Sequence, residues 1–246
     1  IEKVSKIGNA LIKLRHSNNF ISRIGDSDGG KFLPCLNSSD NFNSLEYLDW
    51  FTLKNKKAYF ETLIFNEIPQ LRGLLNSNND RNYRVGKYFS MKNQNLSLIG
   101  TANNIGTNGK GNHQHNDFLS FELYGISPFI VDPWSYCYTG DKYLRNKDRK
   151  TKRHNCVEID NKEIIPVPSD NLFAMIGNIK VNINKIEETT EYWYANFTHN
   201  GYKKLKNGSQ IHTRKFQFNK IKNEFEIIDN MNGKGNHFAK MHLFIP

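Results

Sequence analysis

Two histidines separated by a single residue, His113 and His115, stand directly before an apolar stretch over residues 118–124. We expect this stretch to be a strand, in which alternate side chains point to the same face. Both imidazoles then share a face with apolar residues such as Leu119 and Phe121. Two imidazoles at the end of a buried face are unusual in a strand with a purely structural role. The pattern therefore indicates a site for imidazole chemistry, including metal binding.

An aspartate and a further histidine follow on separate segments. Asp132 comes after the apolar residues 129–131, and His154 stands in a polar stretch. One histidine of the first pair could meet these two residues on one metal ion, with a tetrahedral position left open for water or substrate. Each residue alone is more simply interpreted as a hydrogen-bonded, half-buried polar group. The metal hypothesis therefore depends on all three together.

The residues around these positions resemble a known family, the heparinase II/III-like polysaccharide lyases. The similar residues are 112–117, 119–123, 128–133 and 136–141, with Arg145, Arg149, His154 and Asn155. Weaker similarity extends to residues 23–28, 199–202 and 211–214, so the resemblance covers most of the chain. It implies a β-sandwich preceded by a large helical toroid, and we expect most of that toroid to lie outside this chain.

The resemblance implies one zinc ion, held by His115, Asp132 and His154. Zinc suits this set because imidazole is a good ligand for it and no thiolate is needed. The ion is expected to be structural and to brace the strand end beside it. Cys156 is close in sequence but does not belong to the family's ligand set, so we interpret it as a core residue.

The resemblance also implies which residues meet the substrate. His113 corresponds to a catalytic histidine that contacts substrate near the bond to be cleaved. Tyr138 and Arg149 are expected to bind substrate, since a guanidinium can hold a carboxylate or sulfate through two hydrogen bonds. Structural alternatives stay open, because Tyr138 can simply pack and Arg149 can hold its loop through an ion pair. For Arg145 that structural role, in a pair with Asp141 or Asp148, is favoured.

Three bulky residues depart from the family pattern. Trp134 follows the Asp-Pro pair, Gln114 stands between the two histidines, and Lys152-Arg153 precedes His154. These changes leave the expected zinc ligands intact and bear on the substrate.

The reaction implied by the resemblance is β-elimination in a uronate-containing polysaccharide. It requires a masked carboxylate charge, a base for the hydrogen on C5 and an acid for the departing oxygen on C4. Placed acids and bases typically contribute about 10²–10⁴-fold each, and stabilising the enolate-like intermediate adds a further large factor. His113 could act as the base or face the carboxylate. The family's other catalytic groups, a Tyr, an Asn and a second His, belong to the toroid.

Two other functions remain open. The first is a non-catalytic carbohydrate-binding or surface-polysaccharide assembly protein that keeps the fold and the metal. The second is a domain that binds polyanions through charge alone, with strong salt sensitivity and no dependence on metal.

The distribution of apolar residues predicts a mainly β fold, an antiparallel β-sandwich with a short helical N-terminal segment. Residues 1–82 are expected to form a helical remnant and linker, with helices near 1–16, 40–52 and 58–65 and a polar turn at 76–82. Residues 83–246 are expected to form the sandwich, cut short at its C-terminus. The expected strands cover residues 87–91, 96–101, 118–124, 129–131, 155–159, 176–183, 191–198, 211–219 and 224–230, with turns at 207–208 and 232–233.

The amino-acid composition limits the kinds of binding partner that we expect. The 246 residues carry a net charge of +10, which indicates either a solvated basic surface or a polyanionic partner such as nucleic acid, an anionic membrane or an acidic polysaccharide. The sequence contains no nucleic-acid-binding signature and no apolar run long enough to span a membrane. Three widely spaced cysteines argue against a disulfide framework. The resemblance favours the periplasm or envelope of a bacterium, although nothing in the chain identifies its compartment or polysaccharide.

Overall fold

The computed structural model describes residues 83–85, 88–93, 95–133, 135 and 137–246, together with positions 14, 16, 22, 24 and 25. The helices expected near residues 1–16, 40–52 and 58–65, and the turn at 76–82, fall outside the described residues apart from positions 14 and 16.

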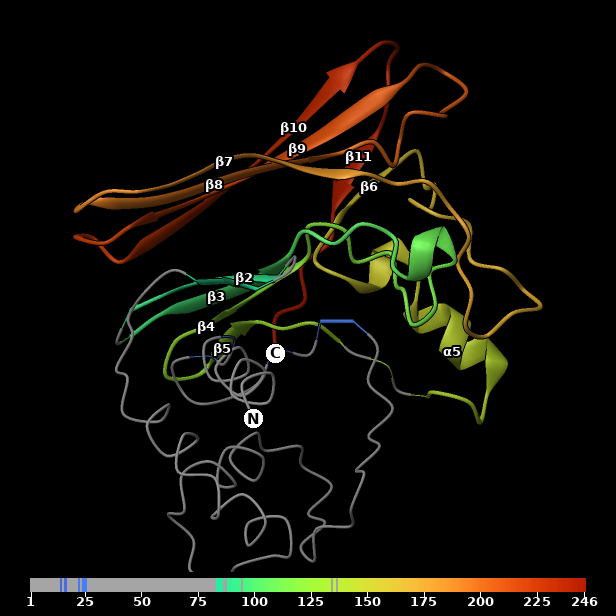
Figure 1. Ribbon diagram of the computed structural model, residues 1–246, viewed down its shortest axis with the longest axis horizontal. Coiled ribbons are helices and arrows are strands. Elements are labelled where there is room, and N and C mark those ends of the chain that lie inside the picture. Colours follow the sequence, from blue (N-terminus) through green and yellow to red (C-terminus); the bar gives the residue numbers. More distant parts are fainter. Residues whose placement is uncertain are drawn as a thin grey trace, which may run out of the picture.

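The described chain forms three antiparallel sheets (Figure 1). The first has five strands in sequence order: β1 (Tyr83–Val85), β2 (Tyr88–Lys92), β3 (Ser97–Thr101), β4 (Phe121–Tyr124) and β5 (Pro128–Ile130). The second has the order β10 (Glu224–Gly233), β9 (Gln210–Asn219), β8 (Tyr192–His199) and β7 (Val181–Glu188). The third pairs β11 (Ala239–Met241) with β6 (Val157–Ile159). Between β5 and β6 lie helix α5 (Lys142–Asp148) and the 3₁₀ turn η3 (Thr151–Arg153), and η2 (Thr107–Gly109) follows β3.

Aromatic side chains join the two larger sheets. The Phe89 ring of β2 lies 4.7 Å from the ring of Phe197 in β8 and 5.1 Å from that of Phe216 in β9. Phe121 of β4 meets Phe216 edge-on at 5.6 Å. Strict alternation of buried and partly exposed residues along β8 turns one of its faces to this core. The prediction of a mainly β sandwich is therefore confirmed.

The position of the Phe89 ring in this core depends on a glycine in β3, Gly100, which is the cross-strand partner of Phe89. A side-chain carbon on Gly100 would lie only 2.3 Å from the ring of Phe89, which is itself buried. Because Gly100 has no side chain, the Phe89 ring can lie directly against the backbone of β3, at the centre of the core between the sheets.

Every expected strand overlaps a strand of the structure, and three elements were missed: β1, β11 and α5. Helix α5 is capped by the Asp141 side chain, which accepts a hydrogen bond from the main-chain N–H of Leu144. Three expectations were wrong in detail. The strand after the histidines begins at Phe121 rather than residue 118, and the turn expected at 232–233 is still part of β10. The strand expected at 176–183 is β7, which runs from Val181 to Glu188.

A buried arginine crosses from the four-stranded sheet to the segments beneath it. Arg214 of β9 donates two hydrogen bonds to the Asp229 carboxylate, at 2.7 and 2.9 Å. Its other terminal nitrogen donates to the main-chain oxygens of Leu119 and Asn155, at 2.7 and 2.6 Å. Since the side chain is fully buried, these bonds replace its hydration.

Two buried histidines continue this network. The N–H of Gly201 donates to Nδ1 of His199, so the proton of a neutral His199 sits on Nε2 and donates to Nδ1 of His212 at 2.8 Å. Nε2 of His212 then donates to Asp229 at 2.7 Å. Burial lowers the pKa of both histidines, that of His199 well below its ordinary value. Both rings are therefore neutral at pH 7.

The packing at Gly100 gives the first prediction. Gly100→Ala should destabilise the fold by about 1–3 kcal/mol, because the added methyl overpacks a core that cannot yield locally. Gly106→Ala is the matched control, since nothing lies within 4 Å of its added carbon. Urea unfolding measures both variants. Equal midpoints for the two would contradict the close approach.

The neutral histidines give the second prediction, on pH. Because their pKa values are lowered in the folded protein, the unfolded chain binds more protons near pH 6.5 and below. Stability should therefore be lost as pH falls below about 6.5, at up to about 1.4 kcal/mol per pH unit for each proton taken up. The difference in melting temperature between pH 7.5 and pH 5.5 should shrink in a His199→Gln variant. If the difference in melting temperature were the same in the variant and the wild type, a group other than His199 would cause the loss of stability at acidic pH.

Candidate active site and metal centre

The segment that carries His113 and His115 is an irregular loop and not the beginning of a strand. His113 has a φ of 59° and Leu119 a φ of 60°, so the chain turns twice through the left-handed region. As a result His113 is exposed while His115 is completely buried. The expectation that both imidazoles share one face is therefore wrong, and each is available for a different task.

Hydrogen bonds fix this loop to its surroundings. Asn116 donates its amide to the main-chain oxygen of Ile165 at 2.8 Å and accepts from the N–H of the same residue at 2.9 Å. Gln114, one of the departures from the family pattern, donates to the main-chain oxygen of His115 and to Asp117. The larger side chain thus stabilises the loop between the two histidines.

The exposed histidine meets the tyrosine that was expected to bind substrate. His113 Nδ1 and the Tyr138 hydroxyl share a hydrogen bond of 2.8 Å, and the two rings are nearly parallel, with centroids 5.8 Å apart. Phe173 contacts both rings, at 6.3 and 5.7 Å. Residues 25 positions apart in sequence therefore form one partly exposed aromatic and polar cluster.

Arg145 lies beneath this cluster. Its guanidinium is 5.0 Å from the centre of the Tyr138 ring and donates to the Ser135 hydroxyl at 3.3 Å. The same nitrogen lies 3.3 Å from Nε2 of His115. A buried structural role agrees with the favoured interpretation of Arg145, whose Nε also donates to the main-chain oxygen of Leu172 at 3.3 Å.

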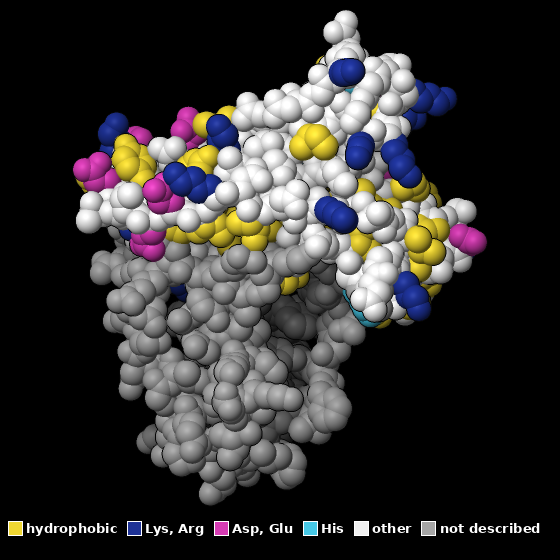
Figure 2. Space-filling view, turned by 45° about the horizontal axis from the view of Figure 1, so that its top comes forward, with side chains coloured by type: hydrophobic (Ala, Val, Ile, Leu, Met, Phe, Trp, Pro, Cys, Tyr) yellow, Lys and Arg dark blue, Asp and Glu magenta, His cyan; other side chains and the backbone are white. Residues whose placement is uncertain are grey.

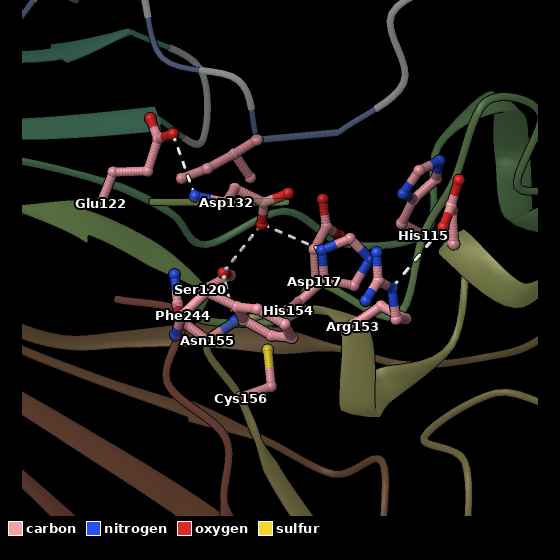
Figure 3. A network of polar contacts seen from close by, with 12 residues as sticks. His115, Asp117, Ser120, Glu122, Asp132, Arg153, His154, Asn155, Cys156 and Phe244 are labelled. Carbon is pink, nitrogen blue, oxygen red and sulfur yellow. Dashed lines mark hydrogen bonds and ion pairs between the residues drawn. The ribbon is translucent and has the colours of Figure 1, made fainter. Parts of the chain in front are cut away.

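The two remaining expected zinc ligands touch each other. His154 Nδ1 lies 2.9 Å from Asp132 Oδ2, and both side chains are completely buried (Figure 3). Burial alone would lower the pKa of His154, but the charge of Asp132 and their hydrogen bond outweigh it and raise that pKa. Ser120 completes the group, since its hydroxyl lies 3.4 Å from the same carboxylate oxygen and accepts from the N–H of Asn155.

The donor types, burial and proximity of these residues fit zinc, although the donor atoms are engaged with one another. The rings of His115 and His154 are 5.1 Å apart, and Nε2 of His154 is a buried nitrogen with no hydrogen-bond partner among the described residues. Donors sharing one tetrahedral zinc, with bonds of about 2.0–2.1 Å, lie about 3.3 Å apart. The 2.9 Å contact is shorter. In the described part of the chain, no three His, Cys, Asp or Glu side chains form a ready-made metal site.

Comparison with known families supports the resemblance. Residues 76–244 match the family model described as "Heparinase II/III-like, C-terminal". The chain belongs to this family. A search among curated proteins finds none that matches it. The family name points to a polysaccharide lyase, and the match covers the part of the chain that forms the sandwich.

The heparinase II/III-like domain holds Asp132, one of the expected zinc ligands, through a carboxylate that sequence analysis did not single out. Glu122, buried in β4, accepts a hydrogen bond from the main-chain N–H of Asp132 at 3.2 Å (Figure 3). Its other oxygen lies 3.3 Å from His16, whose ring stacks on Tyr124 at 3.8 Å and contacts Ser97. A glutamate within an apolar strand was the available signal, because such a side chain is rarely buried without partners.

Arg149 lies inside the domain rather than at its surface. Its fully buried guanidinium donates to the main-chain oxygens of Leu172, at 2.6 Å, and Asn171, at 3.2 Å. A substrate could reach it only if this segment moved. Its contacts instead hold the segment that places Phe173 against His113 and Tyr138.

Two further observations complete the description. Cys156 is buried, as expected of a core residue, and burial raises the pKa of its thiol well above the ordinary value. Among the described residues, no helix has the length and apolar character needed to cross a membrane.

The contrast between His113 and Arg149 gives the third prediction. His113→Asn should change the free energy of unfolding by less than about 0.5 kcal/mol, because the side chain is exposed and asparagine tolerates the left-handed backbone. Arg149→Met should cost about 1–3 kcal/mol, since the hydrogen bonds that its buried guanidinium donates to Leu172 and Asn171 are lost. Chemical denaturation of both variants tests this. If His113→Asn were the more damaging change, the histidine would have a structural role.

Proposed function

We propose that this chain supplies the β-sandwich part of a polysaccharide lyase that cleaves a uronate-containing polysaccharide by β-elimination. Family membership supports the reaction class. The observation that carries the proposal is the pairing of the exposed His113 with the Tyr138 hydroxyl at 2.8 Å. An imidazole and a phenol in contact at a surface are two groups that can exchange a proton with a bound sugar.

In this proposal His113 is the catalytic residue and Tyr138 binds substrate beside it. Abstraction of the C5 proton leaves negative charge on the uronate carboxylate, and loss of the C4 oxygen requires a proton. His113 acts as base or faces the carboxylate, and the hydrogen bond to Tyr138 fixes the orientation of its ring. Phe173 and Tyr138 offer apolar ring surface to a sugar. The remaining acid–base groups and the masking of the carboxylate are assigned to the helical toroid that precedes this domain in the family.

We also propose that His115, Asp132 and His154 bind one structural zinc ion. When bound, the ion supplies a fixed positive charge that ties the loop of His115 to the segments of the other two residues. Arg149 is given an indirect role, because it holds the segment of Phe173. The acidic polysaccharide is the partner in this proposal, and the compartment in which the protein meets it is left open.

A non-catalytic carbohydrate-binding or surface-polysaccharide assembly protein that keeps the fold and the metal is the second candidate. The aromatic rings beside His113 suit it equally, because such a surface can bind a sugar without cleaving it. The two candidates differ in one respect that can be measured, since only the lyase produces an unsaturated uronate.

The fourth prediction tests the reaction. The natural protein, including its helical toroid, should generate the ultraviolet absorbance of a C4–C5 double bond from at least one member of a panel of polyuronides. His113→Asn should reduce kcat by about 10²–10⁴-fold with little change in stability. Residues 1–246 alone should be inactive. Binding of polyuronides without any double-bond formation would favour the second candidate instead.

The fifth prediction tests the metal. Protein purified without chelator should contain one zinc per chain by elemental analysis, and His115→Ala should lower both the zinc content and the melting temperature, because binding is coupled to folding. His113→Asn is the control, since it changes the neighbouring histidine outside the ligand set and should retain the ion. Zinc-free wild-type protein of unchanged stability after metal addition would remove the zinc from the proposal.

A further inference from the structure

A second place on the domain combines a hollow with chemistry suited to a sugar. Three loops meet where β6, β8 and β10 end, and they enclose a hollow of about 390 Å³. This volume is within the range of about 300–1,000 Å³ that is usual for small-ligand sites. The lining residues are Asp160, Asn161, Lys162, Leu205, Lys206, Asn207 and Phe238. None of these residues belongs to the His113 cluster, whose Tyr138 ring lies against Arg145 of α5, the helix labelled at the right of Figure 1.

Short hydrogen bonds fix the first and third loops together. Both oxygens of Asp160 are used, one by the N–H of Phe238 at 2.9 Å and the other by Nδ1 of His237 at 2.7 Å. Nε2 of His237 lies 3.0 Å from the main-chain oxygen of Lys234. Because both ring nitrogens face oxygen acceptors, the protonated imidazole satisfies both contacts, and the hydrogen bond to Asp160 raises the pKa of His237.

The middle loop is held by close main-chain contact. A side-chain carbon on Gly208 would lie 2.0 Å from the main-chain oxygen of Lys234, and one on Gly235 would lie 1.8 Å from that of Asn207. Both glycines also have positive φ. Only glycine allows this approach, so the walls of the hollow are preformed rather than assembled on binding.

The charge of the hollow is positive. The Asp160 carboxylate is already bonded to His237, whereas Lys162 and Lys206 form no ion pair within the part of the chain that the structure describes. Lys240 donates to Asn161 at 2.6 Å and places its ammonium 5.3 Å from the ring centre of Phe238. An aromatic ring that is 61% exposed therefore stands between cationic and amide groups.

The opposite end of the four-stranded sheet has a different character. Figure 2 shows most of the visible acidic side chains gathered at the left, while basic side chains predominate toward the right. In this region two lysines are neutralised by neighbours: Lys185 pairs with Glu187 within β7, and Lys220 pairs with Glu188. Lys162 and Lys206 at the hollow have no such ion pair among the described residues.

We propose that this hollow is an accessory binding site for one or two residues of an acidic saccharide, with Lys162 and Lys206 binding its carboxylate or sulfate and Phe238 packing against a sugar face. Amides of Asn161 and Asn207 supply hydrogen bonds to hydroxyl groups. The choice of saccharide as the ligand rests on the proposed function. The site itself rests on the hollow, its charge and its braced loops. It would hold a polymer on the domain while a distant part of the same chain is processed.

Isothermal titration of the whole chain with a galacturonate tetramer, a sulfated glycosaminoglycan tetramer and neutral maltotetraose tests the proposal. The two acidic probes distinguish carboxylate from sulfate, and the neutral sugar should not bind detectably. Lys162→Gln combined with Lys206→Gln should weaken binding of the preferred acidic probe about tenfold or more. Lys185→Gln combined with Lys220→Gln removes the same net charge from the acidic end and should change binding by less than twofold. Phe238→Ser should weaken binding without altering the charge.

The alternatives give separable results. Equal weakening by both double variants would overturn the site and leave attraction by overall charge. Equal binding of an inorganic polyphosphate of similar charge, lost in the same Lys162 and Lys206 variant, would overturn the saccharide assignment. Binding that is lost in His113→Asn but retained in the hollow variants would place the ligand in the active site only. A protein that forms unsaturated uronate while its hollow variants bind normally would refute this inference and leave the proposed lyase function intact.

Discussion

The fold of this domain depends on one buried guanidinium. Arg214 joins its own strand β9 to Asp229 on β10, and it also donates to the main-chain oxygens of Leu119 and Asn155. Leu119 ends the loop that carries the two closely spaced histidines, and Asn155 follows His154. The four-stranded sheet is therefore attached by one side chain to both segments that carry the proposed zinc ligands His115 and His154. Because a buried charge without partners costs several kcal/mol, these segments and the sheet form a single cooperative arrangement.

The site shows how the same loop serves two purposes. The left-handed backbone at His113 and Leu119 turns the side chains of His113 and His115 in different directions. The His113 imidazole is exposed beside Tyr138, and the His115 imidazole is buried beside His154. Arg145 lies between the two groups, with its guanidinium against the Tyr138 ring and close to His115. The exposed pair and the buried residues are thus mechanically connected. A shift of the buried group would move the surface on which a substrate is proposed to bind.

Sequence analysis found the strands because alternation of apolar residues is a local signal. In β8, for example, Trp193, Ala195 and Phe197 are buried in turn, as the pattern requires. It missed α5 because the buried residues of that helix are Arg145 and Asp148, which carry charge and form no apolar stripe. It placed His113 and His115 on one face because positive φ at a residue other than glycine leaves no mark in the sequence. Arg149 was expected to bind substrate because the sequence does not show that its guanidinium is buried against main-chain oxygens more than twenty positions away. The residue types of the candidate site could be read from the sequence, but their depth in the domain could not.

The contact of His16 with the sandwich lies outside the segment that matches the family. His16 lies sixty residues before the matched family segment begins, yet it stacks on Tyr124 and reaches the buried carboxylate of Glu122, which in turn holds the main chain of Asp132. A shortened protein that started at residue 76 would keep every residue of the family match. It would also leave an aromatic face uncovered and a buried glutamate without this imidazole. The segment defined by sequence similarity therefore leaves out one of the contacts that surround Glu122 and Tyr124. If the sandwich were transferred to another protein during evolution, the segment with His16 would have to be transferred as well, or another residue would have to replace its contact.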